Sequence, residues 1–198
     1  HSFSTESPKL AVPGNHQGWN PPTAPRIAAS AYGATDYEGY IWLDGGHKFV
    51  APDAAGNFNW GNTDWGWDGS TVGVLVVDGE QDLNAPAGYY RVRANTTTLT
   101  YDEVLTTWGI IGAATPNGWD SSTQLTYNST TKKWEGIVVM TAGEFKFRAN
   151  NDWAINFGGP VEAMTYDGPN LSVDAAGTYL VQLDLSNPRE YTYTLTAQ

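Results

Sequence analysis

The sequence has no cysteine and few cationic residues. Without cysteine there can be no disulfide, no thiolate catalysis and no cysteine-based metal site. Ten Lys and Arg stand against 21 Asp and Glu, so the formal net charge is −11. A surface of this sign repels polyanions, and we therefore expect no nucleic-acid partner. No apolar run approaches the roughly 20 residues that a membrane-spanning helix needs.

Sustained helical periodicity is also missing, whereas turn and strand residues are abundant. Glycine (22) and proline (11) are frequent beside many Thr and Asn, and 40% of the residues are hydrophobic, which is enough for a core. Short alternating runs separated by such turns predict antiparallel strands. In the second half we expect strands at Trp108–Ile111, Gln124–Tyr127, Lys133–Met140, Gly143–Arg148, Ala154–Phe157, Gly177–Leu185 and Glu190–Thr196.

An internal repeat divides the chain. Gln17-Gly18-Trp19-Asn20 returns as Asn117-Gly118-Trp119-Asp120, and later motifs return at a shrinking offset, so the first copy carries an insertion. The repeat predicts an all-β protein of two tandem antiparallel β-sandwich domains, immunoglobulin-like or carbohydrate-binding-module-like. We place them at residues 1–102, with the insertion near 62–70, and at residues 103–198.

The segment Glu144–Trp153 separates its side chains by face. On a strand, successive side chains point to opposite sides, so Phe145 and Phe147 are expected in the core. Lys146 and Arg148 then share the opposite, solvent-facing side, with Trp153 shortly after them. Cationic donors beside an exposed aromatic ring suit a carbohydrate, because the ring covers the apolar sugar face while Lys, Arg and Asn (here Asn150) donate to hydroxyls.

Nine tryptophans are several times the ordinary number, and most are expected in the core. Trp42 and Trp134 fall on strands and are interpreted as structural. Trp19 and Trp119 lie in Gly-rich loops and are equally compatible with core and ligand contact, whereas Trp153 is expected to be exposed. The remaining candidates gather near the insertion of the first repeat, where at least one should be exposed: Trp60, Trp65 and Trp67.

Other chemistries find less support. Two carboxylates could hydrolyse glycosides, but most Asp residues occupy turn contexts, and Glu38 and Glu135 precede strands in both repeats. Asp53, Asp64 and Asp68 could hold calcium, although Asp-rich turns explain them better. The three histidines are isolated, which argues against zinc. We expect no enzyme activity, no metal and no cofactor.

Several motifs resemble SusE/SusF-type outer-membrane glycan-binding lipoproteins of Bacteroidota. They are Val12–Trp19, Tyr37–Tyr40, Trp108–Asp120, Trp134–Gly136 and Glu144–Trp153. The resemblance implies non-catalytic proteins on the outer face of the bacterial outer membrane that hold glycans, starch in the founding members, for an uptake system. It also implies that a further N-terminal module and a lipidated cysteine precede this sequence in a longer protein.

The resemblance points to Trp119, Lys146, Arg148 and Trp153 in the second domain, and to Trp19 and Lys48 in the first. The first domain departs from the pattern, because the repeat alignment sets Val50 opposite Arg148 and Gly56 opposite Trp153. Its site is therefore rebuilt from the tryptophans near the insertion, binds differently, or does not bind.

The working hypothesis is a monomeric, non-catalytic polysaccharide-binding protein that works with other outer-membrane uptake components. An α-glucan is the favoured ligand, on the resemblance alone. Xylan, mannan or β-glucan are the alternatives within this class. A structural or adhesive repeat protein without glycan binding and, less favoured, a glycoside hydrolase are the alternatives outside it.

Overall fold

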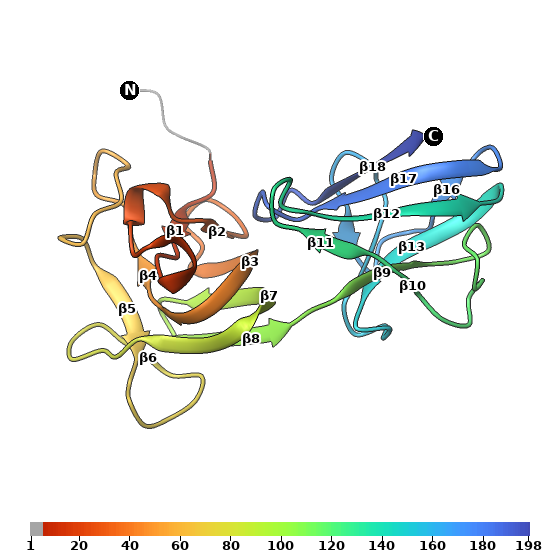
Figure 1. Cartoon of the computed structure of the whole chain (residues 1–198). Coiled ribbons are helices and arrows are strands. Elements are labelled where there is room, and N and C mark those ends of the chain that lie inside the picture. The colour runs from red at the N-terminus through yellow and green to blue at the C-terminus, as the bar shows by residue number, and fades with distance from the viewer. Residues whose placement is uncertain (1–5) are drawn as a thin grey trace. The chain divides into compact units, whose positions relative to one another are not determined.

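The computed structural model describes residues 6–198, so the first five residues of the predicted first domain lie outside the described part. The protein is all-β, as predicted, with antiparallel sheets throughout. Its contacts divide it into two compact units, His1–Leu105 and Thr106–Gln198, called here the first and second modules (Figure 1). Within residues 6–198, no helix has the length and apolar character needed to cross a membrane.

The first module is one sheet of eight strands that curls around its main hydrophobic cluster. Its elements are β1 (Lys9–Ala11), two 3-10 helices η1 (Asn15–Gln17) and η2 (Pro21–Thr23), β2 (Arg26–Ala29), β3 (Asp36–His47), β4 (Phe49–Val50), β5 (Asp64–Trp67), β6 (Leu75–Val76), β7 (Leu83–Asn95) and β8 (Thr100–Leu105). The strand order is β6-β5-β4-β1-β2-β3-β7-β8, and an isolated bridge from Val74 to Thr100 joins the two outer ends.

Long strands make this curvature possible. β3 and β7 pair over almost their whole lengths, with a register shift between Leu43 and Gly45, and such a bulge bends the strands. Alternation along β3 turns Ile41 and Leu43 into the core, where both are at most 3% exposed. Trp42, interpreted from the sequence as structural, is instead 41% exposed, because it occupies the opposite face of the same strand.

The second module consists of two sheets. Its strands are β9 (Trp108–Ile111), β10 (Thr123–Gln124), β11 (Thr126–Asn128), β12 (Lys133–Met140), β13 (Gly143–Ala149), β14 (Asn156–Gly158), β15 (Thr165–Tyr166), β16 (Leu171–Val173), β17 (Gly177–Asp184) and β18 (Thr192–Ala197). One sheet has the order β10-β9-β13-β14-β15, with β16 also paired to β13, and the other has the order β11-β12-β17-β18. The predicted strands are confirmed to within a few residues, except that Gln124–Tyr127 is divided between β10 and β11, and β15 and β16 were missed.

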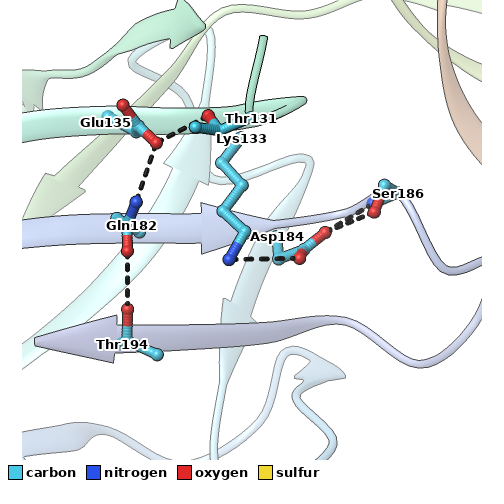
Figure 2. A network of polar contacts seen from close by, with 7 residues as sticks. All are labelled: Thr131, Lys133, Glu135, Gln182, Asp184, Ser186 and Thr194. Atoms are coloured by element: carbon cyan, nitrogen blue, oxygen red, sulfur yellow. Dashed lines mark hydrogen bonds and ion pairs between the residues drawn. The ribbon is translucent and has the colours of Figure 1, made fainter.

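The outer face of the β11-β12-β17-β18 sheet is held by a ladder of polar side chains (Figure 2). Gln182 donates to Glu135 at 2.8 Å, and Thr194 donates to Gln182 at 3.2 Å, so three neighbouring strands are linked. Thr131 also donates to Glu135 at 2.6 Å, and these hydrogen bonds lower the pKa of the Glu135 carboxyl group. The interactions give Glu135 the structural role that its place in the repeat predicted.

Candidate functional site

The candidate site of the second module is built on β13, where the predicted alternation is confirmed. Phe145 and Phe147 are fully buried on one face of the strand. Lys146 and Arg148 lie on the other face, but they are only 9% and 5% exposed. The expectation of a solvent-facing cationic edge is therefore wrong. The turn that follows β13 folds back and brings the Trp153 ring next to both cations.

Two indole rings form the exposed part of this site. The ring centroids of Trp119 and Trp153 lie 6.2 Å apart with an interplanar angle of 29°, and the residues are 42% and 45% exposed. The guanidinium carbon of Arg148 lies 4.8 Å from the Trp153 centroid, and the Lys146 ammonium lies 6.0 Å from it. At these separations cation–π attraction holds the ring over the charges. The site is thus a nearly parallel aromatic pair beside two cations.

Arg148 is fixed by neutral acceptors. Its Nε donates to Ser122 Oγ at 2.8 Å, and its Nη2 donates to Asn151 Oδ1 at 2.7 Å. The same Asn151 oxygen accepts the Ser122 backbone N–H at 2.8 Å. Burial lowers the pKa of Arg148, whereas the nearby Asp152 charge acts in the opposite direction. The guanidinium is consequently held in one position without an ion pair to a carboxylate of the described residues.

Lys146 has even fewer partners. Within residues 6–198 its ammonium makes no hydrogen bond and no ion pair. Burial lowers its pKa, and the charge of Asp167 compensates in part. Buried charges are normally paired, as Glu38 is with Arg93 at 2.7 Å. Lys146 therefore keeps its donors available at the edge of the aromatic pair.

The turn after β13 contains two asparagines, Asn150 and Asn151, with different contacts. Asn150 and Asn151 adopt φ values of 56° and 53°, a left-handed conformation that Asn tolerates better than most residues. Asn150 Oδ1 accepts the Thr107 backbone N–H at 2.8 Å, so this candidate ligand residue also anchors the turn. Asn151, which positions Arg148, was missed, although the Asn-Asn pair directly after the strand could have indicated this turn.

The first module also presents an aromatic pair. Trp19 and Trp60 lie 6.1 Å apart with an interplanar angle of 37°, and Trp60 is 44% exposed. The Trp60 indole N–H donates to the Trp19 carbonyl at 3.0 Å, and that of Trp19 donates to Asn15 Oδ1 at 2.9 Å. The repeat alignment that set Gly56 opposite Trp153 does not hold here, because Trp60 occupies the place beside Trp19 that Trp153 occupies beside Trp119.

The other residues predicted for the first module lie elsewhere. Trp65 and Trp67 are half-buried and pack against the core, and Trp67 donates to the Thr71 carbonyl at 3.0 Å. The Lys48 ammonium is bound by Glu80 at 2.6 Å and Asp64 at 3.5 Å. Burial alone lowers the pKa of Lys48, but the Glu80 hydrogen bond and the two negative charges outweigh it and raise the pKa. Lys48 is therefore paired with carboxylates, whereas Lys146 has no ion pair with any residue from 6 to 198.

Of the three aspartates considered for calcium, Asp53 and Asp68 serve as turn residues, whereas Asp64 lies on β5 and pairs with Lys48. The Asp53 carboxylate accepts the backbone N–H groups of Ala55 and Asn57, and that of Asp68 accepts those of Ser70 and Thr71. These hydrogen bonds lower the pKa of both carboxyl groups. Over residues 6–198, no cluster of three or more His, Asp or Glu side chains could hold a metal ion.

The fold and the site together define a class: an all-β protein whose modules each contain a tryptophan pair, with both rings exposed in the second module and Trp60 exposed in the first. Neither a protein-family model nor a curated protein matches the sequence. Among solved structures, SusF from Bacteroides thetaiotaomicron is similar at 16% identity and a TM-score of 0.39, over 99% of this chain and 50% of SusF. The chain thus spans half the length of that protein.

Proposed function

We propose that this chain is a non-catalytic polysaccharide-binding protein and that Trp119, Trp153, Lys146 and Arg148 form its main binding site. The proposal rests mainly on one observation. Two exposed indoles stand beside two nearly buried cations that have no carboxylate partner among the described residues. A structural cluster would pair its charges, as this chain does at Glu38 and Arg93. The unpaired donors support a role in ligand contact.

The chemistry of a pyranose matches this arrangement. One sugar face consists of C–H groups, and burying it against indole contributes about 1–3 kcal/mol, as for an apolar side chain. The ring edge carries hydroxyls that accept hydrogen bonds, and a bond to a charged donor contributes about 1.5–3 kcal/mol. After the costs of association, a few such contacts give affinities of roughly micromolar to millimolar. A polymer that repeats the same sugar compensates for weak individual contacts.

The favoured ligand is an α-glucan such as starch or its malto-oligosaccharides, as the resemblance to SusE/SusF-type proteins implies. Xylan, mannan and β-glucan remain alternatives, because stacking plus cationic donors suits several hydroxyl-rich polymers. We further propose display on the outer face of a bacterial outer membrane and cooperation with other components of a glycan-uptake system. These two proposals rest on the resemblance.

Affinity electrophoresis and calorimetry test the proposal. Retardation in amylopectin gels, or the affinity for maltoheptaose, xylohexaose or mannohexaose in calorimetry, should be reduced at least several-fold in Trp153→Ala. The control is Trp42→Ala, which removes an indole of similar exposure (41% against 45%) from the first module. If no polysaccharide of the panel binds, or if Trp153→Ala binds like wild type, the proposed site is wrong. Release of reducing ends during incubation would identify an enzyme instead.

A further inference from the structure

The aromatic pair of the first module lies beside a negatively charged side chain, whereas that of the second module lies beside two cations. Gly46 is the key residue, because a Cβ atom at this position would lie 3.0 Å from Cζ2 of Trp19 and 3.3 Å from Oδ2 of Asp82. The edge of the Trp19 ring and the Asp82 carboxylate therefore both lie close to the half-buried Gly46. In the second module, the corresponding polar groups are the two cations next to Trp153.

Asp82 is an acceptor without a partner. It is exposed, and within the described part of the chain it makes no hydrogen bond and no ion pair. The nearby Glu80 differs, because it is occupied by the Lys48 ammonium at 2.6 Å. Lys48 is thus paired with Glu80 and Asp64, whereas the Asp82 carboxylate near Trp19 has no ion-pair partner among residues 6–198.

Hydrogen bonds within the first module fix the orientations of the Trp19 and Trp60 rings. Both indole N–H groups are used within the module, by Asn15 and by the Trp19 carbonyl, so the rings have fixed orientations. Fixed rings lose little conformational freedom when a ligand stacks on them. A pre-formed apolar surface with one adjacent acceptor is therefore available, even though the donors seen in the second module are missing here.

We propose that Trp19, Trp60 and Asp82 form a second sugar site, in which a carboxylate accepts hydrogen bonds from hydroxyls in place of the cationic donors. The inference rests on the proposed function, since it assumes that paired indoles in this chain bind pyranoses. A sugar hydroxyl both donates and accepts, and a carboxylate can accept hydrogen bonds from two neighbouring hydroxyls through its two oxygens. The ligand class is a neutral polysaccharide with free vicinal hydroxyls.

This arrangement has a consequence for specificity. A uronic acid would bring its own carboxylate close to Asp82, and like charges at short range oppose binding. The first-module site should therefore reject acidic sugars. In the second-module site, Lys146 and Arg148 would attract an acidic sugar, and they partly offset the nearby charges of Asp167 and Asp152.

The experiment isolates the first module within the intact chain. The Trp153→Ala variant removes the main site, and residual binding of maltoheptaose, xylohexaose and mannohexaose is measured by calorimetry. In this background Asp82→Ala should weaken the residual affinity roughly fivefold or more, since a charge-assisted hydrogen bond is lost. Asp78→Ala, which removes another exposed acid of the same loop, should change it less than about twofold. Gly46→Ala should also weaken it, because the added methyl group presses on Trp19 and Asp82.

The charge itself is tested with a matched pair of ligands. The neutral oligosaccharide that binds is compared with the same oligosaccharide oxidised at C6 to the uronic acid. The Trp153→Ala variant should prefer the neutral form, and adding Asp82→Asn should reduce that preference.

The possible results separate the two proposals. If Asp82→Ala binds like its background while Trp60→Ala does not bind, the role of Asp82 is refuted and an aromatic site remains. If Trp153→Ala shows no residual binding, the second site is refuted and the main site stands. If wild-type protein binds none of the sugars, both proposals fail.

Discussion

Replacing Lys146 by Met should make the second module more stable and its ligand binding weaker. Lys146 is 9% exposed and has no hydrogen-bond or ion-pair partner within residues 6–198. A buried polar group without a partner costs about 1–3 kcal/mol, and residual contact with water at the mouth of the site reduces this. We therefore expect Lys146→Met, which keeps an unbranched side chain of similar length, to raise the free energy of unfolding by about 1 kcal/mol. For a module of this size, that corresponds to about 4–8 °C in Tm.

Replacing the neighbouring cation, Arg148, by Met should lower the stability of the second module instead of raising it. Arg148→Met leaves Ser122 Oγ without its donor and removes one of the two donors to Asn151 Oδ1, so it should destabilise the module by about 1–3 kcal/mol. Both substitutions should reduce the affinity for the polysaccharide about tenfold, since each removes a charged hydrogen-bond donor. The opposite changes in stability would show that Arg148 also holds its neighbours in place, whereas Lys146 serves only to contact the ligand.

Hydrogen–deuterium exchange is the suitable assay, because the amides of β9 and β13 report on the second module alone. Calorimetric titration of the same samples gives the affinity. If Lys146→Met lowers the protection of these amides, Lys146 contributes to the fold. If the affinity is unchanged while protection rises, the ammonium does not contact the ligand, and the reasoning from its missing partner is refuted.

Three further predictions concern pH and two structural anchors. Burial lowers the pKa of Lys146 below its ordinary value of 10.5. The affinity for the polysaccharide should therefore fall as the pH rises from neutrality, with a midpoint below 10.5. Calorimetry should show no such fall in Lys146→Met. Over the same rise, the unfavourable buried charge disappears from the folded state, so the stability advantage of Lys146→Met should shrink in urea titrations. Asn150→Ala, which loses the Thr107 contact at a left-handed position, should destabilise the second module by about 1–2 kcal/mol in urea unfolding, and Asn150→Gly should be less harmful. Glu103→Ala leaves the fully buried His47 ring without its 2.5 Å partner and should cost the first module about 1–3 kcal/mol, measured by exchange of the β3 and β7 amides.

Each of these expectations can fail in a distinct way. A pH profile that is the same in wild type and Lys146→Met would assign the titration to another group. Equal stability of Asn150→Ala and Asn150→Gly would show that the side-chain hydrogen bond, and not the backbone conformation, decides the cost. Loss of protection in the second module after Glu103→Ala would show that the two modules do not unfold separately.

Local patterns predicted much of the second module and less of its site. Strict alternation placed Phe145 and Phe147 in the core, and the position of Trp153 after a polar run predicted its exposure; both expectations are confirmed. Alternation cannot show what covers a strand face, however. Lys146 and Arg148 were expected in solvent because the turn that folds over them depends on two left-handed asparagines, and strand periodicity does not contain that information.

The first module shows the same limit over longer distances. Trp19 and Trp60 are 41 positions apart, and their contact depends on how two loops meet at one end of the sheet. The ion pair of Lys48 likewise depends on a distant residue, Glu80, which lies in the segment after β6. A repeat alignment compares residues in order along the chain. It therefore matches the wrong residues where an insertion changes which loop reaches the site. Trp19 and Trp60 were both recognised as candidates, but the contact between them was not predicted.

Comparing the two modules indicates which part of such a site changes readily. Both preserve a tryptophan pair at nearly equal separation, 6.1 Å and 6.2 Å, on sheets of different construction. The polar neighbours have exchanged sign, from Lys146 and Arg148 in one module to Asp82 in the other. Stacking requires rings at a fixed spacing, because the contact area depends on their geometry, whereas hydroxyls can satisfy a donor or an acceptor equally well. We therefore infer that the spacing of the rings is the constrained feature, and that the charge beside them sets which modified sugars each module admits.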